Sequence, residues 1–401
     1  MRRYDIIIIG AGISGLSLAH YCAGEGLKTL VIEKSEKVGG TFHSHRFENE
    51  AKGFWIELGA HTCYNSYRNL LEIIEDCRIL DRLIKREKVG FKMLVDNKLK
   101  SIPSQLNFAE LFFTAPRMLT LKKGGQSVES YYSRIVGRHN FERVLAPAFN
   151  AVISQRANDF PADMLFKKRE RRKEIMKKFT LTDGIQTITD SIASQENIQL
   201  IKGKDVQAIK SGDDFFKVTT ADGTNYESLN LALATPAPIT AQLLQISFPE
   251  VAQQLSQIRM ATVESLGVAV KKDMLSLERV AGIIPTDNGF YSVVSRDIVR
   301  HNNYRGFTFH FRPGLMDHET KLNRISQVLG VQRNRLDHLI TKENFVPSLR
   351  VGHDKLINEV DRLIAGKRLL LTGNYFSGMA IEDCVSRSLK EFSRLKGLIK
   401  V

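Results

Sequence analysis

The chain has 401 residues, 43% hydrophobic and 25% charged, and its 58 Lys+Arg against 44 Asp+Glu give a formal net charge of +14. These values exclude a disordered or collagen-like chain, and no apolar run approaches the roughly 20 residues that cross a bilayer. Four scattered cysteines without a CxxC pair argue against a disulfide scaffold or a zinc site and fit a reducing compartment.

The amino-terminal region begins with a short apolar run. Four isoleucines at residues 6–9 stop at Gly10, whereas the apolar core of a secretory signal runs for about 7–15 residues. A β-branched run of this length predicts a parallel strand buried on both faces. We therefore predict no export signal and a cytoplasmic protein.

A glycine-rich loop follows that strand. Gly10 permits a tight turn, Gly12 lets the backbone approach a pyrophosphate, and Gly15 allows a helix to pack closely on the strand. After a helical pattern, a second buried strand at 29–32 ends on Glu33, eighteen residues after Gly15. This spacing is close to that expected of a carboxylate that binds ribose hydroxyls, so the order predicts dinucleotide binding.

A second glycine turn indicates which dinucleotide is bound. Gly39-Gly40-Thr41 follows Glu33 after a short gap, and residues 5–46 together resemble the FAD-binding signature of the amine oxidase and protoporphyrinogen oxidase superfamily. In that superfamily the paired glycines close over the FAD pyrophosphate and ribityl chain. The resemblance therefore implies FAD as the cofactor.

The rest of the chain interleaves strand and helix patterns rather than forming two tandem domains. Asp222-Gly223 is a strong hairpin signal. The expected elements are a strand leading into a turn (54–62), a helix (70–84), a hairpin (91–103), a mostly helical region (108–178) and strands at 198–209, 215–220 and 229–237.

The resemblance extends over nearly the whole chain in the family's own order. Its motifs are GFWIELGAH (53–61), DNKLKSIP (96–103), a segment at 124–154, LTDGIQTITDSIA (181–193), DVQAI (205–209), LATPAP (233–238), a segment at 344–360 and LLLTGNYFSGMAIEDCVSRSL (369–389). The implied fold is α/β, with a Rossmann-like, GR2-type FAD-binding domain and an interleaved α+β substrate-binding domain. The implied segments are 1–90, 181–240 and 346–401 for the FAD-binding domain, 91–180 for a helical substrate- or membrane-facing region, and 241–345 for the substrate sheet.

The resemblance also implies which residues contact the cofactor. The early motif would bring backbone to the flavin, and the carboxy-terminal motif would line the isoalloxazine edge. The implied set is Gly10, Gly12, Ile13, Ser14, Gly15, Glu33, Lys34, Gly39, Gly40, Thr41, Gly59, Ala60, Val206, Gly373, Asn374, Met379, Ala380 and Ile381.

Three positions depart from the family pattern. The terminal motif usually continues Asp-Cys-Ile-x-Ser-Gly, whereas Arg387 follows Asp383-Cys384-Val385-Ser386 here, and His61 stands where some members carry arginine beside the flavin. Residues 262–270 lack the lysine that amine oxidases place beneath flavin N5, which favours porphyrinogen oxidation over amine oxidation. His61 is the candidate catalytic residue, because an imidazole can change charge near neutral pH. A purely structural hydrogen bond to backbone is the alternative.

The implied activity is dehydrogenation of a porphyrinogen, with hydride transfer to the flavin and reoxidation by oxygen. The alternatives are an isoprenoid desaturase with an apolar tunnel, a redox-neutral flavin mutase that needs arginines for a diphosphate, and a flavin-free binding protein on the same fold. No metal site is predicted, since His43 and His45 alone are more often local polar packing.

Strict alternation at residues 307–312 marks a candidate substrate wall. As a strand, it places Phe307, Phe309 and Phe311 on one face and Arg312 on the other. The aromatic face could stack on a flat substrate while Arg312 meets a carboxylate, but a half-buried sheet with its phenylalanines in the core is the favoured interpretation. Tyr291 and Tyr304 are weaker candidates.

Two segments bear on larger partners. Residues 167–178 hold eight basic and two acidic side chains, and 108–123 combine large apolar residues with Lys122-Lys123. Both are candidates for contact with an anionic lipid surface, on the inner face of the membrane. The alternatives are a solvated basic helix and an ordinary core helix. Nucleic acid is not predicted, because no aromatic-interleaved binding module accompanies the basic run.

Overall fold

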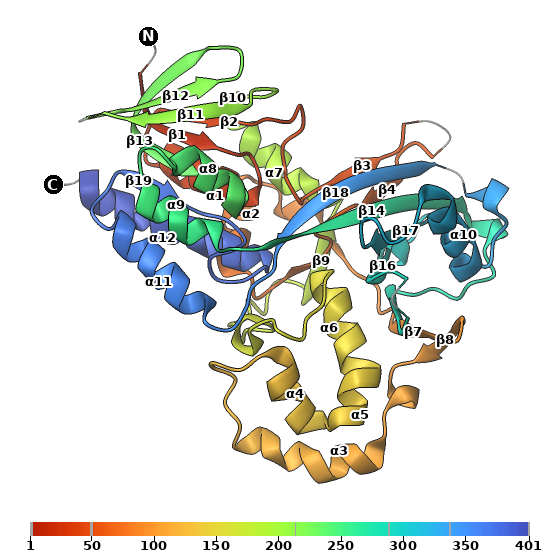
Figure 1. Ribbon diagram of the computed structural model, residues 1–401. Coiled ribbons are helices and arrows are strands. Elements are labelled where there is room, and N and C mark those ends of the chain that lie inside the picture. Colours follow the sequence, from red (N-terminus) through yellow and green to blue (C-terminus); the bar gives the residue numbers. More distant parts are fainter. Residues whose placement is uncertain (1–2, 49–50, 213, 288, 337, 400–401) are drawn as a thin grey trace.

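Two large sheets dominate the computed structural model, with a group of helices beneath them (Figure 1). The structure describes residues 3–48, 51–212, 214–287, 289–336 and 338–399. The two chain ends of the expected segmentation, residues 1–2 and 400–401, lie outside these ranges.

The first sheet draws its strands from three separate parts of the chain. β1 pairs in parallel with both β2 and β13, as its all-apolar sequence predicts. In spatial order the strands are β10 (Ile198–Ile201), β2 (Thr29–Ile32), β1 (Arg3–Ile9), β13 (Asn225–Leu233), β12 (Phe216–Thr220) and β11 (Val206–Ser211), with β19 (Leu369–Leu371) paired to β13.

Helices cover both faces of this sheet. Ile6 and Ile8 pack into one hydrophobic core and Ile7 and Ile9 into another, because successive strand residues point to opposite faces. The first core is closed by α1 (Ile13–Gly24), α2 (Arg68–Asp76), α7 (Gln186–Ala193) and α12 (Ile381–Ile399). The second is closed by α8 (Ala237–Leu244), α9 (Pro249–Ser256) and α11 (His353–Ile364).

The second sheet lies to the right in Figure 1. Its long central strands pair antiparallel, and α10 (His318–Leu329) covers one face. In spatial order the strands are β18 (Leu339–Pro347), β14 (Met260–Lys271), β17 (Tyr304–Phe311), β16 (Ser292–Ser295), β15 (Gly282–Pro285), β7 (Phe91–Val95) and β8 (Lys98–Ser101).

Smaller elements complete the fold. The lower helical group comprises α3 (Phe108–Thr114), α4 (Val128–Val136), α5 (Arg138–Asn140), a π-helical turn (Phe141–Leu145) and α6 (Ala146–Ile153). Short pairings join β3 (Ser44–Arg46) to β4 (Trp55–Glu57), and β9 (Lys178–Leu181) to β5 (Cys63–Tyr64) and β6 (Leu83–Lys85). Single 3₁₀ turns span Leu80–Arg82, Pro103–Gln105, Ala115–Leu119, Ala162–Met164, Lys272–Met274, Arg296–Ile298 and Arg333–Arg335.

Two expected helices are shorter than predicted. The helix expected over 70–84 ends at Asp76, because Arg78 adopts a left-handed φ of 56° and the chain then enters β6. The helical region expected over 108–178 ends at Ile153, and the basic run that follows is irregular. Its backbone and side chains bond to neighbouring segments instead of forming helical turns.

The expected α/β class is confirmed, and so is the hairpin at Asp222-Gly223, which joins β12 to β13. Residues 241–258 pack against the first sheet rather than the second. We therefore propose that the segment expected at 241–345 begins at β14, and that β7 and β8 from the start of the expected 91–180 region also belong to the substrate sheet.

Candidate active site

The glycine loop turns the chain from β1 directly into α1. Gly10 has a φ of 100°, a conformation that side chains rarely adopt. A Cβ on Gly15 would lie 1.9 Å from the Gly10 carbonyl oxygen, so the helix approaches the strand as closely as backbone allows. Ile13 and Ser14 are buried in the first helical turn, whose free N–H groups form an anion-binding end.

Glu33 lies beside this loop. Its carboxylate accepts hydrogen bonds from the Ala11 N–H at 2.7 Å and the Ser35 N–H at 2.9 Å. Lys34 forms an ion pair with Asp205 at 3.0 Å, and Val206 opens β11 at the next residue. The structure therefore brings Glu33, Lys34 and Val206, three of the residues expected to contact FAD, close together.

The paired glycines close over the first loop. The Gly39 N–H donates to the Ala11 carbonyl at 2.8 Å, and a Cβ on Gly40 would lie 3.3 Å from the Gly12 Cα. The turn at Gly59-Ala60 lies directly against the paired glycines, since the Ala60 N–H donates to the Thr41 carbonyl at 3.0 Å. A Cβ on Gly59 would lie 2.1 Å from that same carbonyl oxygen. These turns form a continuous backbone cradle.

The carboxy-terminal motif reaches the cradle through α12. Gly373, Asn374, Met379 and Ala380 lie between β19 and this helix, and Ile381 is its first residue. The Ser388 hydroxyl donates to the Ser14 carbonyl at 2.7 Å, which fixes α12 against the first turn of α1. The helix that follows the carboxy-terminal motif is therefore packed beside the glycine loop.

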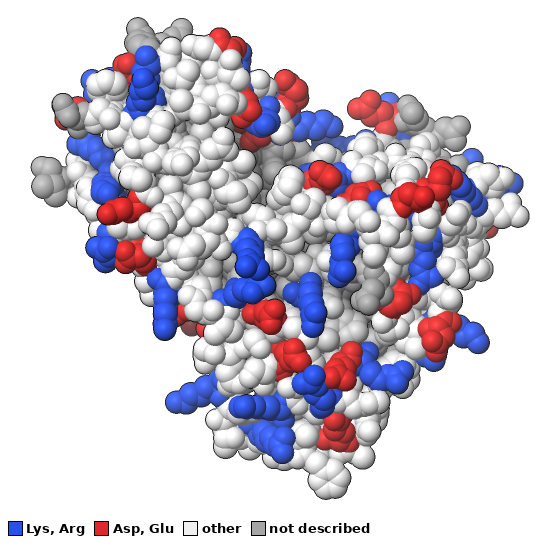
Figure 2. Space-filling model, in the orientation of Figure 1, with Lys and Arg blue, Asp and Glu red and all other residues white. Residues whose placement is uncertain are grey.

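The basic run at 167–178 forms ion pairs with the carboxy-terminal motif and with α2. Lys167 and Arg169 pair with Asp383 of α12 at 3.2 and 2.7 Å, and Arg172 binds both oxygens of Glu75 at 2.7 Å. The alternative of a solvated basic helix is therefore wrong for this segment. Lys and Arg side chains gather at the centre of the face in Figure 2, between the first sheet and the helical group.

A row of polar side chains crosses the second sheet. Lys342 of β18, Ser265 of β14, His310 of β17 and Ser292 of β16 stand directly opposite one another, so they share one face. His310 Nδ1 lies 2.9 Å from the Ser265 hydroxyl. Burial lowers the pKa of His310 to about 3, so this imidazole is neutral.

Asn344 connects this row to the turn at Leu58-Gly59, which we call the flavin turn. Its amide donates to the Ser265 hydroxyl at 3.0 Å and to the Leu58 carbonyl at 2.7 Å, and its Oδ1 lies 3.5 Å from a Cβ built on Gly59. Asn344 Oδ1 and Ser292 Oγ are buried without a partner among the described residues. Unpartnered buried acceptors at a backbone cradle indicate a missing ligand.

His61 lies on the loop after β4, half-buried beside that row. Its Nδ1 is 3.3 Å from the Gly59 carbonyl, which can only accept, so the proton belongs on Nδ1 and Nε2 is left as an acceptor. Burial, and next the charge of Arg86, lower the pKa of His61 to about 4. The expectation that it changes charge near neutral pH is therefore wrong.

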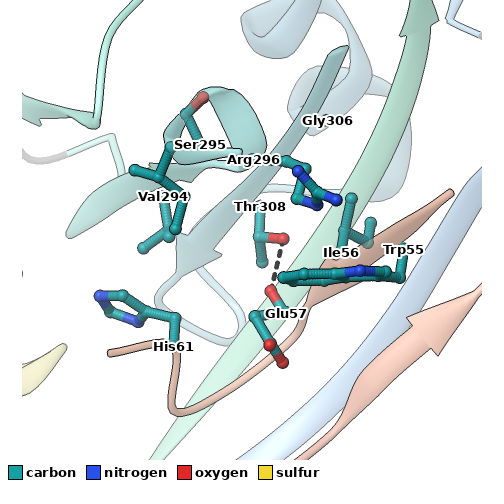
Figure 3. A pocket seen from close by; sticks show the side chains of 10 residues that line it. Trp55, Ile56, Glu57, His61, Val294, Ser295, Arg296, Gly306 and Thr308 are labelled. Carbon is teal, nitrogen blue, oxygen red and sulfur yellow. Dashed lines mark hydrogen bonds between the residues drawn. The ribbon is translucent and has the colours of Figure 1, made fainter. Parts of the chain in front are cut away.

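A small cavity of about 10 Å³ lies between His61 and Arg296 (Figure 3). Arg296 stacks 4.0 Å from the centre of the Trp55 ring, and its pKa is lowered to about 10 by burial. Thr308 donates to the Glu57 carbonyl at 2.7 Å. The cavity holds no more than one water-sized group, so it is a gap beside the site rather than the substrate chamber.

The phenylalanines expected to stack on a substrate do not face the site. Phe307, Phe309 and Phe311 are fully buried against α10, so the core interpretation is correct and the substrate role is wrong. Arg312 is exposed at the end of β17, and its Nε donates to the Tyr291 hydroxyl at 3.1 Å. Tyr304 is buried in a separate small core.

Comparison with known proteins identifies the family. The family model described as "Flavin containing amine oxidoreductase" matches residues 13–298, more than half of the chain. The chain belongs to this family. FAD is therefore its cofactor, and the continuous cradle and the unpartnered Asn344 Oδ1 fit it. FAD would be held by the glycines of the two loops, namely Gly10, Gly12, Gly15, Gly39 and Gly40.

Individual relatives of this flavin-dependent family member are more distant. A 15-cis-phytoene desaturase from Synechococcus elongatus is 36% identical over 78 residues, which cover 20% of this chain and 16% of the desaturase. A crystal structure of a provisionally named protoporphyrinogen oxidase from Exiguobacterium sp. 255-15 has a TM-score of 0.77 at 18% identity and covers 98% of this chain and 99% of its own. A reduced UDP-galactopyranose mutase has a TM-score of 0.75 at 13% identity, covering 98% and 96%. The solved structures show the shared fold.

Several residues of this family member's site were not found from the sequence. Ser265, His310, Asn344 and Lys342 come from three strands that are distant in the chain. The alternation at 307–312 placed His310 opposite the phenylalanines and was the one available signal. Arg387 is not at the flavin edge, because it is buried 3.9 Å from the Phe376 ring centre and pairs with Asp361 and Glu391.

Proposed function

We propose that the protein is an FAD-dependent oxidoreductase that dehydrogenates a porphyrinogen. The observation that supports this choice is exposed Arg312, which lies just after β17 and two residues beyond His310 of the polar row. Exposed Arg312 suits a substrate that carries carboxylates, since guanidinium groups bind carboxylates well. An isoprenoid substrate has no carboxylate for this cation to bind.

The chain's own residues orient the substrate. Bound FAD supplies the two-electron acceptor that takes hydride from a substrate C–H bond. His61 Nε2 accepts a hydrogen bond from a pyrrole N–H, and Arg312 binds a carboxylate beyond the end of β17. The pyrrole proton leaves to solvent in each round, and dioxygen takes the two electrons and two protons as hydrogen peroxide. Repeated rounds give the aromatic macrocycle.

Oxygen consumption and porphyrin fluorescence test this activity together. We expect aerobic protein given a porphyrinogen to consume oxygen as the fluorescent porphyrin appears. Turnover of a sugar nucleotide without oxygen consumption would instead favour the flavin mutase, for which a structural relative exists. A colourless protein that cannot be reconstituted with FAD would favour a binding protein.

Replacing His61 tests its role at the site. Because its pKa is about 4, we expect His61→Ala to lower kcat by roughly tenfold through loss of one hydrogen bond, with FAD content unchanged. His61→Gln, which keeps an acceptor, should recover most of that loss. Unchanged kinetics in His61→Ala would restrict His61 to its bond with the Gly59 carbonyl.

We also propose that the protein contacts an anionic lipid surface through α3 and the following 3₁₀ turn. Phe112 and Phe113 are 77% exposed and Leu119 is 85% exposed, so the alternative of a core helix is wrong for this segment. The segment forms the lower edge of the molecule in Figure 1, and Arg117 and Lys122 are exposed beside it. Exposed apolar groups flanked by cations suit an interface. Among the described residues, no helix has the length and apolar character to cross a bilayer.

Vesicle flotation tests this contact. We expect the native protein to float with phosphatidylglycerol vesicles and the triple variant Phe112→Ser, Phe113→Ser, Leu119→Ser to bind at least roughly tenfold more weakly, because each apolar side chain contributes roughly 1.5–3 kcal/mol on burial. Ile246→Ser is the control, since Ile246 is 87% exposed elsewhere. Equal flotation of the triple and control variants would refute the contact.

A further inference from the structure

Lys342 occupies a position between the glycine cradle and the polar row. It lies on β18 directly opposite Ser265, and its ammonium donates to the Gly40 carbonyl. Two residues further along the strand, Asn344 bonds to the Leu58 carbonyl beside the flavin turn. Lys342 is half-buried, and its hydrogen bond to the Gly40 carbonyl holds the ammonium at the cradle.

No carboxylate neutralises this ammonium among the residues that the structure describes. Its pKa is lowered to about 8, and burial is the cause. A second basic group lies close enough to feel this charge, since burial first, and then the charges of Lys342 and Lys37, lower the pKa of His43 to about 4. A buried cation costs free energy unless an opposite charge pairs with it. The missing partner is therefore an anion that the protein itself does not supply.

We propose that Lys342 supplies the positive charge that pairs with an anionic part of bound FAD. Two parts of FAD qualify, namely the diphosphate and the ring system that gains negative charge on reduction. The bond to Gly40 places Lys342 at the cradle, and its register with Ser265 places it at the end of the polar row. A nearby cation favours both anions, and charge near the flavin also tunes its electronics. This inference rests on the proposed use of FAD.

The test compares native holoenzyme with Lys342→Met, Lys342→Arg and the control Lys37→Met. Lys37 is exposed, and its charge also lowers the pKa of His43. Among the described residues it has no hydrogen bond to the cradle. FAD retention is measured from the fluorescence released on dilution. Sulfite affinity, a chemical probe of positive charge at the ring system, and the reduction potential are measured on the same samples.

We expect Lys342→Met to change one of these readouts and Lys342→Arg to restore it. At least roughly tenfold weaker FAD retention with unchanged sulfite affinity assigns Lys342 to the diphosphate. At least roughly tenfold weaker sulfite binding with a lower potential and unchanged retention assigns it to the ring system. Unchanged retention, sulfite affinity and potential, or equal losses in Lys37→Met, would overturn the inference. A native protein that binds no FAD would instead refute the proposed function.

Discussion

Replacing Gly15 with alanine is expected to strip most of the FAD from the purified protein. The new Cβ would lie 1.9 Å from the Gly10 carbonyl oxygen and 3.1 Å from the Ala234 Cβ, so α1 must move away from β1. That movement takes the first-turn N–H groups away from the position where they bind the pyrophosphate. We expect FAD affinity to fall by roughly 100-fold, and overpacking to cost about 1–3 kcal/mol of unfolding free energy.

Gly24→Ala is the matched control for this prediction. Gly24 lies on the same helix, and a Cβ there meets nothing within 4 Å. Alanine at that position should keep the flavin and gain up to about 1 kcal/mol of unfolding free energy. The flavin-to-protein ratio after desalting and the far-ultraviolet circular dichroism separate loss of cofactor from loss of fold. Gly15→Ala protein that keeps its full flavin content would show that the helix does not need this close approach.

Replacing Arg387 with leucine is expected to destabilise the fold without altering the flavin spectrum. Arg387 pairs with Asp361 at 2.8 Å and with Glu391 at 3.0 Å, and its Nε donates to the Leu371 carbonyl at 2.9 Å. The Glu391 side chain is 1% exposed, so leucine would leave this buried carboxylate with Arg394, at 2.8 Å, as its one remaining cation among the described residues. Loss of one partner of a buried pair costs about 3–5 kcal/mol.

Urea unfolding measures this cost, with Arg362→Leu as the control. Arg362 pairs with Glu359 on the surface, where the two side chains are 69% and 37% exposed, so its replacement should cost about 0.5 kcal/mol or less. The double variant Arg387→Leu, Glu391→Leu should recover part of the loss because it removes the buried charge as well. A cost for Arg387→Leu equal to that of the control would contradict the buried network.

The FAD cofactor could be predicted from the sequence because the signals for it are local. Gly10, Gly12 and Gly15 act within one strand–helix turn, and Glu33 follows at a spacing set by one helix and one strand. The paired glycines reinforce the same site. The roles of these residues depend on local backbone geometry. Their spacing in the sequence is therefore enough to predict those roles.

The substrate side was predicted poorly because its determinants are tertiary. Alternation at 307–312 predicts one buried face, but β17 is buried on both faces because α10 covers one and β4 packs against the other. The pKa of His61 depends on burial by segments that the sequence does not place beside it. The charge of the 167–178 run is visible in the sequence, but its partners Asp383 and Glu75 are not.

The most direct measurement of the proposed activity is anaerobic mixing of the yellow holoenzyme with protoporphyrinogen. If the polar row and Arg312 receive this substrate, the flavin absorbance should bleach within one turnover, and admission of oxygen should restore it. A phytoene-like lipid should leave the spectrum unchanged. Bleaching by the lipid but not by protoporphyrinogen would contradict the porphyrinogen assignment and favour an isoprenoid desaturase.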